Sequence, residues 1–152
     1  MNITYYGHSC FSVSVNGKTI FIDPFIKPNE LAAGVDFDGL LGHYILVSHA
    51  HEDHIADLVE LAKNTGAQVI SNFEIVTWAE KQGITNVHPM NIGGSCEFEF
   101  GTVTMLNAVH SSSFPDGTYG GNPAGFLITV GEKRLYYAGD TALMTDMKLF
   151  GD

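Results

Sequence analysis

The segment that most constrains the fold is residues 49–54, His-Ala-His-Glu-Asp-His, set between an apolar run and an amphipathic stretch. Residues 44–47 are short, β-branched and apolar, which predicts a buried strand. From residue 55 the apolar side chains recur at i, i+3, i+4 and i+7, which predicts a helix over residues 55–65 that stops at Gly66. Because open α/β sheets bind ligands at the carboxyl ends of their strands, this arrangement predicts a ligand site on the loop.

The side chains of this loop indicate metal binding. His49 and His51 point the same way on an extended backbone, whereas Asp53 and His54 follow the bend and are aimed at a second position nearby. A lone surface histidine, or even a pair two residues apart, is usually only a solvated side chain. Four potential ligands between a strand and a helix favour a metal site instead. Imidazole and carboxylate suit zinc, and carboxylate-rich sites also suit manganese or iron.

Other potential ligands also fall at the ends of predicted strands. The pattern predicts strands over residues 3–6, 10–15, 18–22, 67–70, 96–100, 102–110, 124–130 and 134–138, and a second helix over residues 73–82 that Asn72 caps. Asp23 follows one of these strands, His110 ends another, and Asp140 follows the last. Side chains from separate strands that converge on one edge of a sheet are what a metal site requires.

The motifs resemble those of a known family. Residues 49–54 match the H-x-H-x-D-H signature of the metallo-β-lactamase-fold hydrolases. Further matching pieces, similar to the branch related to the ascorbate-phosphate lactonases, are Tyr6-Gly7-His8-Ser9-Cys10-Phe11, Asp23-Pro24, His110-Ser111-Ser112 and Ala138-Gly139-Asp140-Thr141. The resemblance implies an α/β fold, the metallo-β-lactamase-like αββα sandwich. Residues 1–152 would form one such domain, covering the N-terminal half and the crossing strands and lacking the C-terminal portion.

The resemblance also implies roles for individual residues. Two divalent metal ions are expected, with zinc preferred over manganese or iron; His49, His51 and His110 would hold the first, Asp53 and His54 the second, and Asp140 would bridge them. The family supplies a further histidine from beyond residue 152. Asp23 would fix a histidine tautomer as a partner outside the ligand set. The implied catalytic residues are Asp53 and His8, the latter as a substrate contact or proton donor; the alternative for His8 is a satisfied histidine in a turn.

The predicted function is hydrolysis without a protein nucleophile. Two ions a few ångströms apart lower the pKa of a shared water, so that hydroxide is available near neutral pH, and they polarise a carbonyl or phosphoryl oxygen. The expected substrate is an ester, lactone or phosphoester of a small molecule. Two alternatives stay open: a nuclease of the same fold, and a non-catalytic or structural metal-binding protein.

Composition narrows the expected partners and location. The chain has 7 basic and 17 acidic residues and a net charge of -10, which disfavours nucleic acid. No apolar run is long enough to cross a bilayer and the first residues carry no export signal, so we expect a cytoplasmic protein without a membrane partner. Cys10 and Cys96 predict buried, reduced thiols. Residues 145–150 open a further helix near residue 152, so a homo-oligomer or a complementing C-terminal chain is expected to cover the core.

Overall fold

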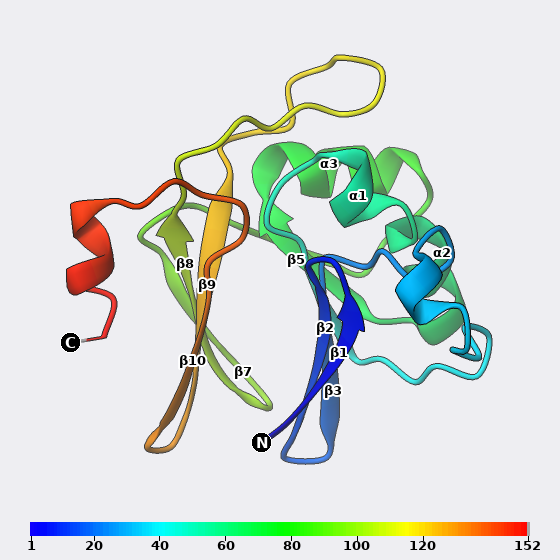
Figure 1. Ribbon diagram of the computed structural model, residues 1–152, viewed down its shortest axis with the longest axis horizontal. Helices are drawn as coiled ribbons and strands as arrows, with labels where there is room; N and C mark the ends of the chain where they lie inside the picture. Colours follow the sequence, from blue (N-terminus) through cyan, green and yellow to red (C-terminus); the bar gives the residue numbers. More distant parts are fainter. Residues whose placement is uncertain (152) are drawn as a thin grey trace.

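Two β-sheets pack face to face in the computed structural model, which describes residues 1–151, and helices cover the outer face of the first sheet (Figure 1). The strand order is β1-β2-β3-β4-β5-β6 in the first sheet and β10-β9-β8-β7 in the second. The strands are β1 Asn2–Gly7, β2 Cys10–Val15, β3 Lys18–Ile22, β4 Tyr44–Leu46, β5 Gln68–Asn72, β6 Val87–Met90, β7 Ser95–Phe98, β8 Gly101–Asn107, β9 Ala124–Val130 and β10 Lys133–Tyr137. The helices are α1 Glu52–Ile55, α2 Leu58–Thr65, α3 Phe73–Lys81 and the 3-10 helices η1 Glu30–Ala32 and η2 Thr145–Lys148.

The first sheet begins with an antiparallel meander and continues with parallel strands. At the turn between β2 and β3, Asn16 and Gly17 have φ of 51° and 73°, the left-handed values that a tight hairpin requires. From β3 to β6 the strands run parallel, with Ile20 opposite Tyr44 and Tyr44 opposite Gln68. Their carboxyl ends therefore lie along one edge of the sheet, here called the rim, where ligand sites of such sheets are found.

Two hydrophobic cores lie on opposite faces of the first sheet. Phe21 and Ile45 pack beneath the helices, whereas their neighbours Ile20 and Leu46 face the second sheet. All four are at most 1% exposed, because alternate side chains of a strand point to opposite faces and both faces are covered here. Burial on both faces is the reason that residues 44–47 form a continuous apolar run.

The start predicted for the helix over residues 55–65 is wrong. The chain forms two helices there, α1 and α2, and α1 begins at Glu52. Asp53 and His54 therefore lie within a helical turn instead of on a loop before it. The predicted stop is confirmed, since Gly66 follows α2 in a left-handed conformation with φ of 71°.

Asp57 separates the two helices. Its N–H donates to Pro24 O at 3.1 Å, outside the helix, and its carboxylate accepts the backbone N–H groups of Ile26 and Lys27 at 2.5 and 2.8 Å. A residue whose side chain and backbone both bond elsewhere interrupts the helix. The break thus ties α1 to the loop that follows β3.

Most other predicted elements are present, with ends shifted by a few residues. Asn72 caps α3 by accepting a backbone N–H from its first turn, as predicted. The strand expected to reach His110 ends at Asn107, so His110 lies on the next loop. Cys96, expected to be buried, is partly exposed, whereas Cys10 is fully buried.

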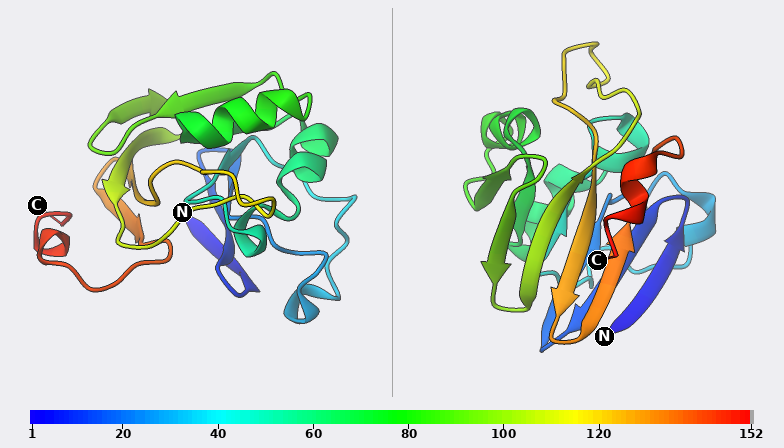
Figure 2. Two further views of the ribbon diagram at one scale, coloured as in Figure 1. Left: turned by 90° about the horizontal axis from the view of Figure 1, so that it is seen from above. Right: turned by 90° about the vertical axis from the view of Figure 1, so that its left-hand side faces the viewer.

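The outer face of the second sheet carries much less helix than that of the first. Within residues 1–151 only η2 stands on that side (Figures 1 and 2). Tyr136 of β10 contacts Phe150 there, with ring centroids 5.4 Å apart. Asp152, the last residue of the predicted domain, lies outside the described residues. None of the helices in residues 1–151 is both long and apolar enough to span a bilayer.

Candidate metal centre

Separate segments of the chain bring all eight predicted site residues to the rim. The first sheet supplies His8 from the β1–β2 turn, Asp23 after β3, His49 and His51 after β4, and Asp53 and His54 from α1; the second sheet supplies His110 after β8 and Asp140 after β10. Both sheets are therefore needed to assemble the site. A sequence pattern indicates which residues follow strands, but only the packing of the two sheets brings the two sets together.

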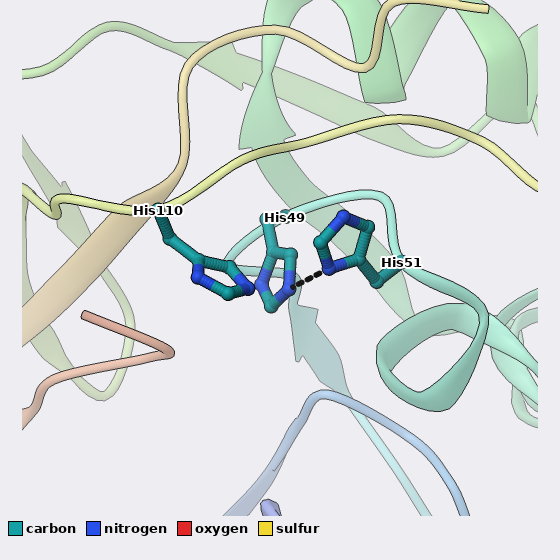
Figure 3. Close-up of side chains that lie close together, drawn as sticks. All are labelled: His49, His51 and His110. Atoms are coloured by element: carbon teal, nitrogen blue, oxygen red, sulfur yellow. Dashed lines mark hydrogen bonds between the residues drawn. The ribbon is translucent and has the colours of Figure 1, made fainter. Parts of the chain in front are cut away.

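Three imidazoles form the first group, called here the histidine cluster: His49, His51 and His110 (Figure 3). One ring nitrogen from each lies within 4.8 Å of the other two. The ring centroids are 4.6 Å apart for His49 and His51, and 5.1 Å apart from either ring to His110. His49 is fully buried and His110 is exposed, with 34% of its side chain accessible, so the cluster opens toward solvent on one side.

The second group, called here the mixed cluster, consists of His8, Asp53 and His54. His8 Nε2 lies 2.8 Å from Asp53 Oδ2, and His54 Nε2 lies 3.8 Å from the same oxygen. Asp140 lies between the two clusters, because its Oδ2 is 3.6 Å from His54 Nε2 and 3.7 Å from His110 Nε2. Asp140 thus lies within 4 Å of one histidine from each cluster.

Asp23 is a buried carboxylate on which several donors converge. Its Oδ1 accepts the Ser48 N–H at 2.7 Å, and its Oδ2 accepts the Ser48 hydroxyl at 2.5 Å, His54 Nδ1 at 2.8 Å and the Tyr137 hydroxyl at 2.6 Å. Asp23 is fully buried and has a left-handed backbone with φ of 48°, a conformation that surrounding structure must hold in place.

This network assigns the tautomers of both buried histidines. His54 Nδ1 carries the proton given to Asp23, so in the neutral imidazole the lone pair of Nε2 faces Asp140. The Ser48 hydroxyl donates its only proton to Asp23. It therefore acts as the acceptor in its hydrogen bond with His49 Nδ1, at 2.9 Å. The lone pair of His49 Nε2 is then directed into the histidine cluster. One carboxylate therefore orients a histidine of each cluster, directly or through Ser48.

His54 Nε2 shows that the residues fit a cation. This atom is buried and has no hydrogen-bond partner among residues 1–151, a condition that costs about 1–3 kcal/mol in a protein interior. Carboxylate oxygens of Asp53 and Asp140 lie 3.8 and 3.6 Å away, too far for a hydrogen bond. A cation among these atoms would satisfy the lone pair and both carboxylates together.

The protonation states of His49 and Asp53 also suit a cation, whereas at His54 Nε2 a proton would compete with it. Burial, followed by the charge of His54, lowers the pKa of His49 from 6.5 to about 4, so its imidazole is neutral near pH 7. Burial acts to lower the pKa of His54 as well, but the hydrogen bond and charge of Asp23, with two nearby carboxylates, outweigh it and raise the pKa. Burial acts to raise the pKa of Asp53, but the charge of His54 and the hydrogen-bonded imidazole beside it lower the pKa overall.

Sequence reasoning did not identify Ser48 and Tyr137 as part of the site. Ser48 directly precedes His49 on the loop after β4, and that position was an available signal. Tyr137 ends β10 and is 114 residues from Asp23 in the chain, so no local pattern indicated their hydrogen bond. Ser111, which follows His110, lies with its Oγ 3.3 Å from His51 Nε2.

Several known proteins are similar to this chain. A family model described as the Beta-lactamase superfamily domain matches residues 19–151. A "UPF0173 metal-dependent hydrolase" of Methylacidiphilum infernorum is 53% identical over 152 residues, covering 100% of this chain and 67% of that protein. Another, of Flavobacterium johnsoniae, is 55% identical over 149 residues, covering 98% of this chain and 66% of that protein. The chain therefore spans about two thirds of the length of these relatives.

A solved structure is similar as well. Igni18, described as a novel metallo hydrolase from the archaeon Ignicoccus hospitalis, matches with a TM-score of 0.84 and 35% identity over 97% of this chain and 64% of that chain. These matches confirm the predicted metallo-β-lactamase-like fold, whereas the lactonase branch stays a prediction, since the relatives' names specify no substrate. With residues 19–151 matched by the family model, the chain belongs to the beta-lactamase superfamily domain family.

Proposed function

We propose that this chain carries the metal centre of a hydrolase that cleaves an ester, lactone or phosphoester of a small molecule. The single observation that supports the proposal most is the pair of clusters joined by Asp140, with the buried Nε2 of His54 facing the gap between them. Two relatives that are more than half identical to this chain are named metal-dependent hydrolases, which supports the reaction class.

Two divalent ions would be held by this chain's side chains. The histidine cluster would hold one, Asp53 and His54 would hold the other, and Asp140 would contact both. Zinc suits the imidazole-rich cluster, and manganese or iron also suit the position with more carboxylate. When bound, such ions supply acidification of water and polarisation of a carbonyl or phosphoryl oxygen.

The chain's own residues prepare the site for that chemistry. Asp23 and Ser48 hold the two buried imidazoles with their Nε2 atoms toward the centre, so no change of tautomer has to accompany binding. Asp53 and His8 share a hydrogen bond at the open edge, where their side chains are 45% and 41% exposed. In our proposal this pair lies on the side from which a substrate reaches the centre.

The charge of the protein supports a small-molecule substrate over nucleic acid. The eight site residues include no lysine or arginine, and the chain has a net charge of -10. Binding to a phosphate backbone depends on lysine and arginine. A lactone of the kind suggested by the lactonase branch is the finer proposal, and it is supported only by the motifs around His8 and Asp140.

Metal reconstitution followed by a substrate panel tests the proposal. Metal-free protein would receive zinc, manganese or iron(II), and hydrolysis of a p-nitrophenyl ester, p-nitrophenyl phosphate, a γ-lactone and an RNA would be measured. We expect turnover of one small molecule that requires metal and that falls at least about a hundredfold in His49→Ala. His43→Ala is the matched control, because His43 is exposed and outside both clusters. Turnover that survives chelation, turnover of RNA alone, or no turnover by metal-loaded protein would each contradict the proposal.

Self-association or binding of a complementing C-terminal chain is also proposed, and exposed apolar side chains support it. Leu143 and Leu149 are 91% and 69% exposed near the end of the described residues. Light scattering of the purified protein at several concentrations would reveal an assembly, whereas a monomer at all of them would contradict this part. A cytoplasmic location stays a prediction that cell fractionation would test.

A further inference from the structure

The backbone at His8 is held in an unusual conformation. Gly7 and His8 have φ of 100° and 54°, both in the left-handed region, and His8 is one of three non-glycine residues among residues 1–151 with positive φ. A Cβ at Gly7 would lie 2.7 Å from the Leu31 side chain and 2.9 Å from that of Asn29, so the turn passes close to its neighbours. Strain of this kind persists where surrounding structure enforces it, and it is concentrated at functional sites.

The side chain of His8 points from this turn into the mixed cluster. Its Nε2 lies 2.8 Å from Asp53 Oδ2, and its ring lies edge-on to those of His54 and Phe25, with centroids 5.6 and 5.4 Å apart. One ligand atom each from His8, Asp53 and His54 lies within 4.8 Å of the others. Three potential metal-ligand atoms therefore surround one point.

A second, independent observation concerns His54. Its side chain is fully buried, its Nδ1 is committed to Asp23, and its Nε2 faces the same point without a hydrogen-bond partner in the described structure. The hydrogen bond between His8 and Asp53 satisfies those two side chains and leaves His54 Nε2 unsatisfied. A cation would bind all three, as well as Asp140 Oδ2 at 3.6 Å from His54 Nε2.

We propose that His8 is itself a ligand of the second metal position, together with Asp53, His54 and Asp140. This assignment differs from a role as substrate contact or proton donor, and it raises the number of imidazoles at that position from one to two. Two imidazoles and two carboxylates suit zinc, iron(II) or manganese. The inference rests on the proposed function only in requiring that the site bind metal.

Titration of metal-free protein with Co²⁺ tests this assignment without any assay of hydrolysis. Equilibrium dialysis counts the ions bound, and the visible absorption of Co²⁺ reports their ligand sets. We expect two ions in the wild type and one in His8→Ala, with the second affinity reduced at least about tenfold and the histidine cluster still occupied. The matched control, His43→Ala, should bind two ions. Two ions bound by His8→Ala with unchanged affinity, or one ion in the wild type, would overturn the proposal.

A measurement on the unmutated protein guards against misfolding of the variant. Protein with ¹⁵N-labelled histidines would be loaded with ¹¹³Cd²⁺, and scalar coupling between cadmium and imidazole nitrogen would be recorded. Coupling to Nε2 of both His8 and His54 is expected, and coupling to His54 without coupling to His8 would overturn the inference. Two bound ions without hydrolysis of any substrate would instead count against the proposed function and leave the role of His8 standing.

Discussion

At the scale of single residues, the buried carboxylate of Asp23 has the widest influence on the site. It accepts hydrogen bonds from Ser48, His54 and Tyr137, which lie on the loop after β4, on α1 and on β10. Charge-assisted hydrogen bonds in a buried setting are stronger than exposed ones. Each donor therefore contributes both to stability and to the direction in which a candidate metal-binding imidazole points.

Tyr137→Phe removes one of these donors and preserves the ring. We expect a loss of unfolding free energy of about 2 kcal/mol, since the hydroxyl donates to a charged acceptor, and a loss of metal affinity of about tenfold, because the orientation of His54 is less well held. Denaturant titration and competition with a chelator measure the two effects.

Tyr136→Phe, on the adjacent residue, is the matched control. The Tyr136 hydroxyl is buried without a hydrogen-bond partner among residues 1–151, so its removal is expected to leave stability unchanged or to raise it. Equal losses in the two variants would show that the hydrogen bond to Asp23 has no special importance.

The two cysteines are expected to differ in reactivity and in their response to pH. Burial raises the pKa of Cys10 from 9.0 to about 12, whereas Cys96 is partly exposed. The folded state holds the Cys10 proton more tightly than the unfolded state does. The stability that the buried, protonated thiol contributes is therefore complete below pH 9 and is lost as pH rises toward 12. At pH 8 a disulfide reagent should modify one thiol in the folded protein and two in denaturant. Rapid modification of both in the folded state would contradict this expectation.

At the scale of elements, the break between α1 and α2 links two parts of the site. Asp57 binds the backbone of the loop after β3, and α1 carries Asp53 and His54. The helical periodicity from residue 55 onward did not indicate this break, because the bonds that cause it come from residues distant in the chain. The turn carrying Asp53 and His54 is thereby fixed relative to the segment carrying Asp23.

Asp57→Ala is expected to destabilise the protein by about 3 kcal/mol, because two backbone N–H groups lose a charged acceptor at a position that is 4% exposed. Glu60→Ala removes another acidic side chain nearby, one that forms only an exposed ion pair with Lys27, and should change stability far less. Thermal and denaturant unfolding compare the two. A small effect of Asp57→Ala would mean that the helices hold their positions through packing alone.

At the scale of the whole molecule, the centre lies where the two sheets meet, so metal binding is expected to stabilise the sandwich. The proposed ligands Asp53 and His54 lie on α1, beside the first sheet, and His110 and Asp140 lie on loops of the second. A ligand that binds only the folded state stabilises it by about 2.7 kcal/mol at a hundredfold excess over its Kd.

Removal of metal should therefore lower the unfolding temperature by several degrees. Differential scanning calorimetry of metal-loaded and chelator-treated protein measures the shift, which should be smaller in His49→Ala than in the wild type. An unfolding temperature independent of metal in the wild type would show that the ions do not link the sheets.

The sequence by itself determined the elements of this protein and the identity of its candidate ligands. Strand and helix periodicity are local properties, and the spacing of residues 49–54 with Asp23, His110 and Asp140 at strand ends indicated one edge rich in potential metal ligands. Only the tertiary structure decided how Tyr137 and Ser48 hold Asp23, how Asp57 divides the helix, and where His8 points. Those features depend on contacts between residues far apart in the chain, about which local propensity carries no information, and the Tyr137 contact also requires that the two sheets pack together.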